Sequence, residues 1–222
     1  MSTGDLYGDR TPTDHERRAG RPWDDSYRER CAPWDIGRPQ AAVVRLAEQG
    51  GFAGSVLDAG CGTGEHALYL AARGCQVVGV DVARTAIDQA RHKAIQRQVD
   101  ASFLVADALH LGRLQRTFDC LLDVGLFHTF DDHERRAYVE SLASVAHTGT
   151  VLHLLCCSDK APGDDGPRRV SQAELRSAFG AGWVTVSIAS ERIEVDPAAL
   201  GDDVPAWLTD GIAAWLATIE RT

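Results

Sequence analysis

A glycine-rich turn is the segment of this sequence whose residue types and spacing point most directly to chemistry. Glycines at positions 60, 62 and 64 follow the apolar stretch 56–59. Glycine reaches positive φ and lets a ligand approach main-chain N–H groups closely. A dinucleotide fingerprint, G-x-G-x-x-G, requires glycine at position 65, where this chain has Glu65, and no Lys-Ser/Thr pair of a P-loop follows. The spacing therefore disfavours a dinucleotide and a nucleoside triphosphate.

Two carboxylates stand where the next two predicted strands end. Asp81 lies 21 residues after Gly60 and follows the strand predicted at 76–80, and Asp107 follows the strand predicted at 102–105. An acidic side chain at the first position accepts both hydroxyls of a ribose, and one at the second could accept from an adenine amine. Because the carboxyl ends of adjacent parallel strands meet at one crevice, we expect a ligand with a ribose, an adenine and a third polar group.

The elements that would position these groups alternate between strands and helices. The predicted strands are 55–59, 76–80, 102–105, 118–123, 150–156, 183–188 and 214–219, and the predicted helices are 65–73, 83–97, 131–146 and one that starts at the capping box 171–174. Such alternation indicates βαβ units and a mostly parallel sheet. With 222 residues and 44% apolar composition, the chain suits one sizeable core rather than two.

Three motifs, taken in order, resemble motifs I, II and III of the class I S-adenosylmethionine-dependent methyltransferases. They are L-D-A-G-C-G-T-G at 57–64, V-G-V-D at 78–81 and V-A-D-A at 105–108, and F-D-C-L-L-D-V-G-L-F-H at 118–128 resembles the family's fourth strand and the loop after it. The segment W-D-D-S-Y-R-E-R-C-A-P-W-D-I-G-R-P at 23–39 is similar to the N-terminal signature of the thiopurine-methyltransferase-like subgroup. The resemblance covers about residues 23–220. It implies an α/β fold with a single Rossmann-like, doubly wound, seven-stranded sheet, mostly parallel, whose antiparallel last strand near 213–220 lies beside 183–188.

The resemblance also implies the cofactor, S-adenosylmethionine, which would leave as S-adenosylhomocysteine. In this family pattern the glycines approach the methionine part with Asp58 nearby, Asp81 holds the ribose, and Asp107 with the Ala108 amide holds the adenine. The implied cofactor-binding residues are Trp34, Asp58, Gly60, Cys61, Gly62, Gly64, Asp81, Val82, Asp107, Ala108 and Val124.

Two of these residues would complete the cofactor site from outside the strand ends. Trp34 would cover the cofactor, and the Val124 carbonyl would face its amino group. Some members of the subgroup carry arginine where this chain has Val124. A side-chain salt bridge from that position to the cofactor carboxylate is therefore absent here or supplied elsewhere.

Methyl transfer from this cofactor requires few catalytic groups from the protein. Methyl transfer from a sulfonium is an in-line displacement, in which the protein mainly positions and desolvates the partners. His128, in the loop after the fourth predicted strand, is a candidate base, because an imidazole of ordinary pKa could accept a proton from a phenol or an amine. The alternative is that His128 packs or caps its loop, and thiolate or halide acceptors need no base.

Aromatic residues near both ends of the site are candidate substrate contacts. We expect the substrate to meet Trp23, Tyr27, Phe127 and His128. Trp23, Tyr27 and Trp34 would form a lid that excludes water. The alternative is simple packing of this N-terminal segment on the sheet, since aromatic side chains bury large areas in either case.

Other conspicuous residues are interpreted as structural. We predict no metal site, because the cluster Asp131, Asp132 and His133 better suits a helix N-terminus, where carboxylates complement the helix dipole. The six cysteines lack C-x-x-C spacing and are expected to be free, mostly buried thiols. The remaining structural assignments are a strand-end acceptor at Asp123, a solvated turn at Asp164 and Asp165, and core packing of Trp207 and Trp215.

Composition limits the partners and the compartment. The formal charge is −9, so the chain is a poor candidate for binding nucleic acid or an anionic membrane. No apolar run approaches the roughly 20 residues of a membrane span, and the start lacks the pattern of a secretion signal. We expect a cytoplasmic protein with a mobile, polar arm at 1–20 and a methyltransferase domain at 21–222 that includes a lid segment at about 21–40. The oligomeric state is not readable from the sequence.

These observations favour one function over three alternatives. The leading hypothesis is transfer of a methyl group to a small aromatic or heterocyclic hydroxyl, amine or thiol. A halide or thiol methyltransferase is the nearest alternative, and the sequence does not separate the two. An NAD-dependent oxidoreductase is disfavoured by the glycine spacing, and a non-catalytic cofactor-binding module stays open, because binding and turnover are separable.

Overall fold

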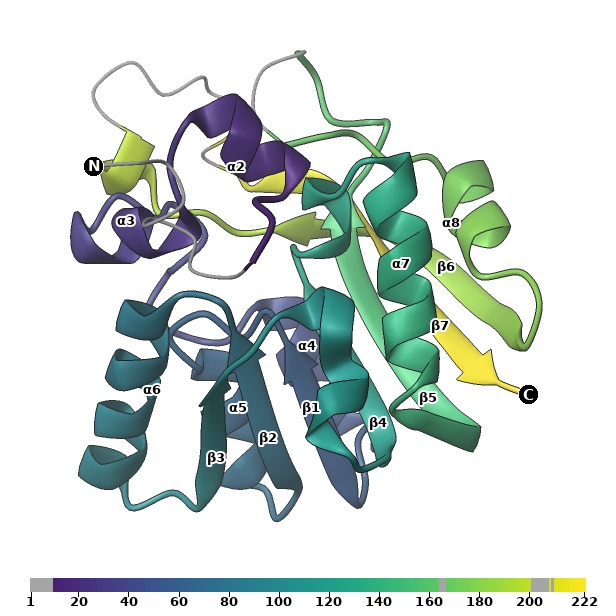
Figure 1. Ribbon diagram of the computed structural model, residues 1–222, viewed down its shortest axis with the longest axis horizontal. Coiled ribbons are helices and arrows are strands. Elements are labelled where there is room, and N and C mark those ends of the chain that lie inside the picture. The colour runs from purple at the N-terminus through teal and green to yellow at the C-terminus, as the bar shows by residue number, and fades with distance from the viewer. Residues whose placement is uncertain (1–9, 164–166, 201–207, 209) are drawn as a thin grey trace.

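The computed structural model describes residues 10–163, 167–200, 208 and 210–222. The turn expected at Asp164 and Asp165 and the packing expected for Trp207 lie outside the described residues. Within these ranges the chain forms one central sheet with helices on both faces (Figure 1).

The sheet contains seven strands in the described ranges, in the order β3-β2-β1-β4-β5-β7-β6. Strand β1 pairs in parallel with β2 and β4, whereas β7 runs antiparallel to β5 and β6. The predicted mostly parallel sheet with an antiparallel last strand is confirmed. The strands are β1 (Ser55–Ala59), β2 (Gln76–Asp81), β3 (Ala101–Val105), β4 (Phe118–Val124), β5 (Ala146–Cys157), β6 (Trp183–Ile193) and β7 (Ile212–Arg221).

The strand order creates the place for a ligand. The chain winds from β1 outward to β2 and β3, and then returns to place β4 on the other side of β1. In open α/β sheets the crevice at such a reversal lies outside the carboxyl ends of the strands and binds ligands. The loops that follow β1, β2, β3 and β4 therefore surround one location.

Alternate side chains of each central strand face opposite layers. In β1, Val56 packs in the layer that holds helices α4, α5 and α6, and its neighbour Leu57 packs in the layer that holds η1, α7 and α8. Trp215 of β7 is buried in the second layer and donates its Nε1–H to the Val170 carbonyl at 3.0 Å, as predicted for a core residue. Parallel strands covered on both faces explain why these segments are almost continuously apolar.

The helices begin close to the residues at which the sequence predicted them to begin. Helix α8 begins with the predicted capping box between Ser171 and Glu174. Helix α7 begins at the predicted place, and Asp131 forms a capping box there with Glu134. The helical segments after β1 are α5 (Glu65–Ala71), α6 (Arg84–Arg97), η1 (Ala108–Leu114), η2 (Phe127–Thr129), α7 (Asp132–Ala143), α8 (Gln172–Ala178) and η3 (Pro197–Leu200), and α4 (Ala41–Glu48) precedes β1.

The N-terminal region differs from the expected arm. Helices α2 (Asp14–Ala19) and α3 (Trp23–Arg28) lie over the carboxyl ends of the strands (Figure 1). We expected residues 1–20 to lack packed structure because they contain few large apolar side chains. In the described part of that arm, hydrogen bonds take the place of apolar contacts, and Glu16 is fully buried among them.

Three further observations concern the cysteines, possible metal ligands and the length of the helices. All six cysteines are free, and four of them, Cys61, Cys120, Cys156 and Cys157, are buried. No group of three or more His, Cys, Asp or Glu side chains within the described ranges could hold a metal ion. Over the same ranges, none of the helices could span a lipid bilayer.

Candidate active site

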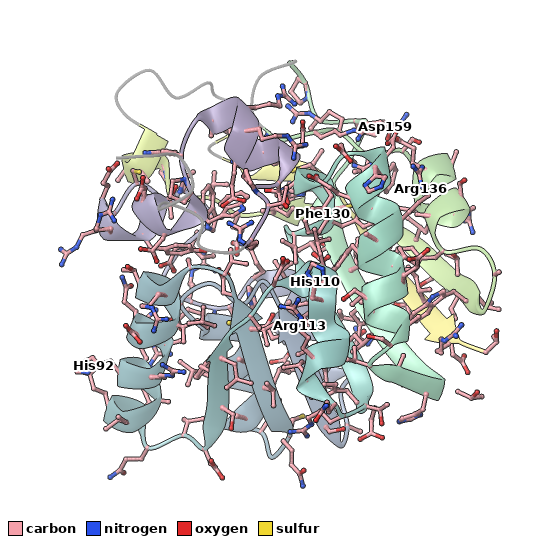
Figure 2. The ribbon with its side chains drawn as sticks, viewed as in Figure 1. His92, His110, Arg113, Phe130, Arg136 and Asp159 are labelled. Atoms are coloured by element: carbon pink, nitrogen blue, oxygen red, sulfur yellow. The ribbon has the colours of Figure 1, made fainter. Side chains whose placement is uncertain are left out.

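A cavity of about 680 Å³ opens at the carboxyl ends of the strands. We call one part the strand-end half, which is lined by Gly60, Cys61, Gly62, Asp81, Val82, Asp107 and Ala108. We call the other part the cover half, which is lined by His15, Ile36, His128, Thr129, Phe130, Ile193, Val195 and Leu208. Phe130, labelled in Figure 2, comes from the loop that leads into α7. The cavity thus joins the predicted cofactor residues to a wall that is largely apolar and aromatic.

The glycine turn has the conformation that its sequence requires. Gly60, Gly62 and Gly64 have φ angles of +74°, +52° and +84°, which other residues rarely adopt. A Cβ on Gly64 would stand 2.7 Å from the ring of Phe103, so this glycine is required by packing as well as by its φ angle. Gly60 and Gly62 line the cavity, but Gly64 does not.

The main-chain amides of this turn are largely used inside the protein. Four of them donate hydrogen bonds of 2.8–2.9 Å to protein acceptors. These are the amides of Gly60 and Cys61, which donate to the Val80 carbonyl, of Gly62, which donates to Asp81, and of Gly64, which donates to the Cys61 carbonyl. A pyrophosphate needs unoccupied donors of this kind. The turn therefore fits a nucleoside without phosphates better than a dinucleotide.

Asp81 ends β2 at the edge of the cavity. Its Oδ1 accepts the Ala83 amide at 2.8 Å, and its Oδ2 accepts the Gly62 amide at 2.9 Å. Each oxygen keeps acceptor capacity for one more donor, which suits the two hydroxyls of a ribose. Burial raises the pKa of Asp81 to about 6, although the two amide hydrogen bonds oppose the shift.

Asp107 lies after β3 and also caps the 3₁₀ segment η1. Its Oδ1 accepts the Leu109 amide at 2.9 Å, and its Oδ2 lies 3.2 Å from Nδ1 of His110. Asp107 and Ala108 both line the strand-end half. The position agrees with the predicted adenine contact, and the capping bonds show what fixes the orientation of this carboxylate.

Asp58 and Asp123 lie beneath the cavity rather than in its wall. Burial, followed by the nearby charge of Asp123, raises the pKa of Asp58 to about 7, and the Asp58 Oδ2 has no hydrogen-bond partner. Asp123 accepts the amides of Leu126 and Phe127 and the Tyr138 hydroxyl, at 2.9–3.3 Å. Asp123 is therefore the strand-end acceptor that was predicted. The unpartnered oxygen of Asp58 is an acceptor that suits a ligand with an ammonium group near the turn.

The N-terminal aromatic residues form a connected cover. The Trp34 indole donates to the Tyr27 hydroxyl at 3.0 Å and meets Trp23 edge to face, with ring centroids 5.4 Å apart. The Tyr27 hydroxyl would stand 2.9 Å from a Cβ added at Gly62, so Tyr27 covers the glycine turn directly. All three aromatic residues line the cavity.

Hydrogen bonds from Asp35 and Gln40 hold the stretch that follows Trp34 against two separate parts of the cavity wall. The Asp35 carboxylate accepts the Thr63 hydroxyl of the glycine turn at 2.9 Å. The Gln40 amide side chain makes two hydrogen bonds with the main chain of Glu194, at 2.8 and 2.9 Å. The Gln40 main-chain amide also donates to Nε2 of His66 at 3.2 Å. This segment therefore ties the turn to the end of β6.

The structure places His128 in the cavity wall but with one ring nitrogen engaged. Its Nδ1 accepts the Cys157 amide at 3.1 Å, so in the neutral ring Nε2 carries the proton. Burial, with smaller contributions from His15, Arg135 and Arg169, lowers the pKa of His128 to about 3. This side chain is therefore suited to donate a hydrogen bond rather than to take up a proton.

The predicted substrate contact at Phe127 is not supported. Phe127 is fully buried and packs against Phe179 with ring centroids 5.8 Å apart, on the side of the α7 and α8 layer. The 3₁₀ turn η2 sends consecutive side chains in different directions, so Phe127 enters the core while His128 and Thr129 reach the cavity. Near η2, Asp131 accepts the amides of His133 and Glu134, which is the helix-capping role predicted for the acidic cluster.

Sequence reasoning missed most of the cover half. These residues come from helix α2, from the loop between β4 and α7, from the end of β6 and from the segment that precedes β7. The cover-half residues that sequence reasoning missed are His15, Thr129, Phe130, Ile193, Val195 and Leu208. It also missed residues that line other parts of the cavity, namely Arg10, Thr13, Gln40, His66 and Arg169. The W-D-I-G-R-P stretch signalled the segment around Trp34, but no local pattern marked the distant segments that meet it.

The fold and the site together define a nucleoside-binding α/β protein with a covered second compartment. Comparisons with known proteins specify the family. A methyltransferase-domain family matches residues 56–149. The 2-heptyl-1-hydroxyquinolin-4(1H)-one methyltransferase of Mycobacteroides abscessus is 39% identical over 165 residues, which are 72% of each chain. The chain belongs to the class I S-adenosylmethionine-dependent methyltransferases.

Two other relatives extend over more of the chain. The probable thiol methyltransferase 2 of Arabidopsis thaliana is 26% identical over 179 residues, which are 79% of each protein. A solved structure described as the conversion of a disulfide bond into a thioacetal group during echinomycin biosynthesis is 37% identical, covers 90% of both chains and has a TM-score of 0.79. The enzyme class and the dependence on S-adenosylmethionine predicted from the motifs are thereby confirmed.

Proposed function

We propose that this enzyme methylates a small heteroaromatic acceptor at a hydroxyl or a thiol group. The observation that carries the proposal is the division of one cavity into a polar strand-end half and a largely apolar cover half. At about 680 Å³ the cavity has the size of a small-molecule site, and it must hold both the cofactor and the acceptor. A macromolecular acceptor does not suit such a covered space.

The strand-end half would hold the cofactor. When bound, S-adenosylmethionine supplies an activated methyl group on a positively charged sulfur. Asp81 would accept the ribose hydroxyls and Asp107 the adenine amine, while Trp34 and Val82 would contact the nucleoside. Asp58, with its unpartnered oxygen, suits the amino group of the methionine part. The fit rests on acceptor groups that the fold leaves available at the correct strand ends.

The distribution of charge favours hydroxyl or thiol acceptors over amines. Four described carboxylates line the cavity, and all belong to the strand-end half or contact it: Asp35, Glu65, Asp81 and Asp107. Within the described residues the cover half presents no carboxylate that could hold an ammonium group. The Nε2–H of His128 would instead donate to an oxygen or sulfur acceptor that carries negative charge.

The shape of the cover half favours a flat organic acceptor over a halide ion. Trp23 and Phe130 supply aromatic surface, and Ile193, Val195 and Leu208 supply aliphatic surface. The chain's similarity to a hydroxyquinolone methyltransferase agrees with an aromatic hydroxyl acceptor. Its similarity to a probable thiol methyltransferase keeps a thiol as the second candidate.

Catalysis by these residues would consist mainly of positioning and exclusion of water. Helices α2 and α3 cover the strand ends, so the acceptor would meet the methyl group away from bulk solvent (Figure 1). Good alignment of two bound reactants contributes on the order of 7–11 kcal/mol to lowering a barrier of this kind. The His128 donor would orient the attacking atom.

A matched set of acceptors tests the proposal. Quinoline rings that differ only in carrying a hydroxyl, a thiol or an amino group would be incubated with the full chain and S-adenosylmethionine, with iodide as the halide. We expect formation of S-adenosylhomocysteine with the hydroxyl or thiol compounds and little with the amine or iodide. Preference for the amine or for iodide would contradict the assignment of the cover half.

A further inference from the structure

Three histidines line the cavity, and they differ in what their ring nitrogens already bind. His66 accepts the Gln40 amide through Nε2, and His128 accepts the Cys157 amide through Nδ1. Each of these rings therefore offers only an N–H in its neutral form. Among the described residues, no side chain or main-chain group hydrogen-bonds to either ring nitrogen of His15. His15 is thus the cavity histidine that can accept a proton without breaking a hydrogen bond of the protein.

His15 has a defined position in the cover half. Its ring stacks on Trp23 with centroids 4.2 Å apart and an angle of 7° between the planes. The ring lines the same cavity as His128, and the two imidazoles interact electrostatically, because a charge on His15 lowers the pKa of His128. An acceptor held by the His128 donor would therefore lie in the compartment that His15 also faces.

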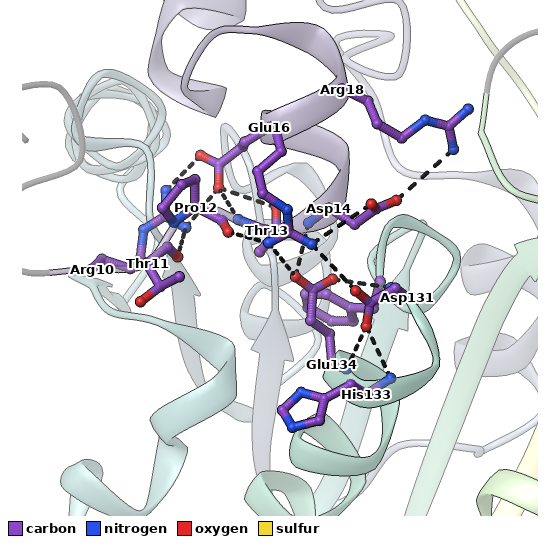
Figure 3. Close-up of polar contacts among 12 residues, drawn as sticks. Arg10, Thr11, Pro12, Thr13, Asp14, Glu16, Arg18, Asp131, His133 and Glu134 are labelled. Atoms are coloured by element: carbon purple, nitrogen blue, oxygen red, sulfur yellow. Dashed lines mark hydrogen bonds and ion pairs between the residues drawn. The ribbon is translucent and has the colours of Figure 1, made fainter. Parts of the chain in front are cut away.

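Hydrogen bonds on both sides of His15 hold helix α2 in place. The buried Glu16 carboxylate accepts the amides of Thr13 and Trp23, at 2.9 and 3.2 Å, and pairs with Arg10 (Figure 3). This network joins α2 to the start of α3 and fixes the stack of His15 on Trp23. A side chain with anchored neighbours keeps one orientation, which a catalytic group requires.

A second network ties α2 to helix α7. The Glu134 carboxylate accepts the Asp14 amide at 2.8 Å and the Arg17 guanidinium at 3.1 Å, and Arg17 also reaches Asp131 at 3.2 Å (Figure 3). Glu134 and Asp131 are the capping box of α7, which directly follows the loop that carries His128. The two histidines are therefore held by elements that are bonded to each other.

We propose that His15 is the general base of the methyl transfer, which rests on the function proposed above. As the acceptor oxygen forms its bond to the methyl carbon, the carbon–sulfur bond breaks and its electron pair stays on sulfur. The acceptor O–H bond breaks in the same step, and the proton moves to a ring nitrogen of His15 and later to solvent. A thiol acceptor would lose its S–H proton in the same way. An acceptor that is already ionised in solution would not need His15.

The surroundings of His15 keep it available as a base near neutral pH. Burial lowers its pKa from the ordinary value, and Arg18 and Arg21 lower it further, while Glu16 and Asp14 raise it. The same cavity wall holds His66 and His128, the guanidinium groups of Arg10, Arg38 and Arg169, and the carboxylates of Asp35, Glu65, Asp81 and Asp107. The net lowering leaves the ring neutral, as a proton acceptor must be.

Two variants of His15 test the proposal in the full chain. His15→Phe keeps an aromatic ring against Trp23, and His15→Gln keeps a polar side chain, but neither can accept the proton. Two acceptors with the same ring would be compared: a hydroxyl that is protonated at the assay pH and one that is ionised. We expect kcat for the protonated acceptor to fall on the order of 10²-fold in both variants, and kcat for the ionised acceptor to change little.

Matched variants separate catalysis from structure. Arg28→Gln, on the neighbouring helix α3 and well exposed, should leave both acceptors unaffected. His128→Phe should slow both acceptors alike, because it removes a donor rather than a base. An equal loss for the two acceptors in the His15 variants, or no loss, would overturn the proposal. Absence of product with every acceptor in the unaltered chain would instead contradict the proposed function.

A titration that does not depend on turnover completes the test. The ring protons of His15 would be followed by NMR from pH 5 to 8, with S-adenosylhomocysteine and the hydroxyl acceptor bound together. We expect the ring resonances and the pKa of His15 to shift when the acceptor is added. If the His15 ring resonances stay unchanged when the acceptor is added, His15 does not contact the acceptor, and the proposal is wrong.

Discussion

The two halves of the cavity are built in contrasting ways. The strand-end half is assembled from three turns that each follow a parallel strand, and its key bonds join residues of adjacent turns, such as the Gly62 amide and Asp81. The cover half is assembled from segments far apart in the chain, such as Gln40 and Glu194, through side-chain contacts. The geometry of the strand-end half therefore follows from the sheet, whereas the geometry of the cover half depends on how separate segments pack over the sheet.

This contrast suggests a division of labour within one methyltransferase. A half that is fixed by strand geometry suits a cofactor that stays the same. A half made by separate segments can change residue by residue without disturbing the sheet, because loops carry binding residues on a rigid scaffold. Variants in the two halves should therefore affect different measurable quantities.

The largest effect is expected at Gly64, which joins the turn to the core. In Gly64→Ala a Cβ would stand 2.7 Å from Phe103 and 2.9 Å from Ala90, at a φ of +84°. Backbone strain and overpacking together should lower the free energy of unfolding by about 2–5 kcal/mol. Urea or thermal unfolding measures this loss.

Gly74→Ala provides the matched control for that experiment. Gly74 has a φ of +95°, but nothing lies within 4 Å of its added Cβ. It should therefore show the strain alone, about 1–2 kcal/mol. Equal losses in the two variants would mean that Phe103 moves aside and that the turn is less tightly tied to the core than inferred.

The contrast also explains what the sequence could predict. The strands, the glycine turn, Asp81 and the capping boxes carry local signals, because periodicity and turn chemistry act over a few residues. His15 carried no such signal, since its polar neighbourhood resembles a solvated arm. The arm packs on the protein because Glu16 and Glu134 accept hydrogen bonds from it, and the bonds to Glu134 join residues that lie far apart in the sequence. For Phe127 and His128 the loop was located correctly, but side-chain direction in a 3₁₀ turn was not readable.

An intermediate effect is expected at Asp81, and it should be confined to the cofactor. Asp81→Asn keeps an oxygen that can accept one amide but removes the charge. Charge-assisted hydrogen bonds contribute roughly 1.5–3 kcal/mol each, so the cofactor Kd should rise about 10–100-fold. Calorimetry with S-adenosylmethionine measures this change, and the acceptor KM at saturating cofactor should stay the same.

The same residue predicts the pH dependence of cofactor binding. The pKa of Asp81 is raised to about 6, and the ionised carboxylate is the stronger acceptor for ribose hydroxyls. Cofactor affinity should therefore weaken as the pH falls through about 6 and level off above it. The Asp81→Asn variant should lack this step, and a step that persists in the variant would assign the titration to another group.

The smallest effect is expected at Gln40, in the opposite half. Its side chain bonds the main chain of Glu194 on both sides, so Gln40→Ala removes two hydrogen bonds that hold the segment after Trp34 against the end of β6. At roughly 1 kcal/mol per bond, the acceptor KM should rise several-fold to about tenfold, while the cofactor Kd stays unchanged. Arg38→Gln is the matched control, because Arg38 reaches the Glu194 carboxylate from an exposed position and surface ion pairs contribute about 0–1 kcal/mol. If Gln40→Ala weakened the cofactor as much as the acceptor, the two halves would be mechanically joined, and the division drawn from their construction would be wrong.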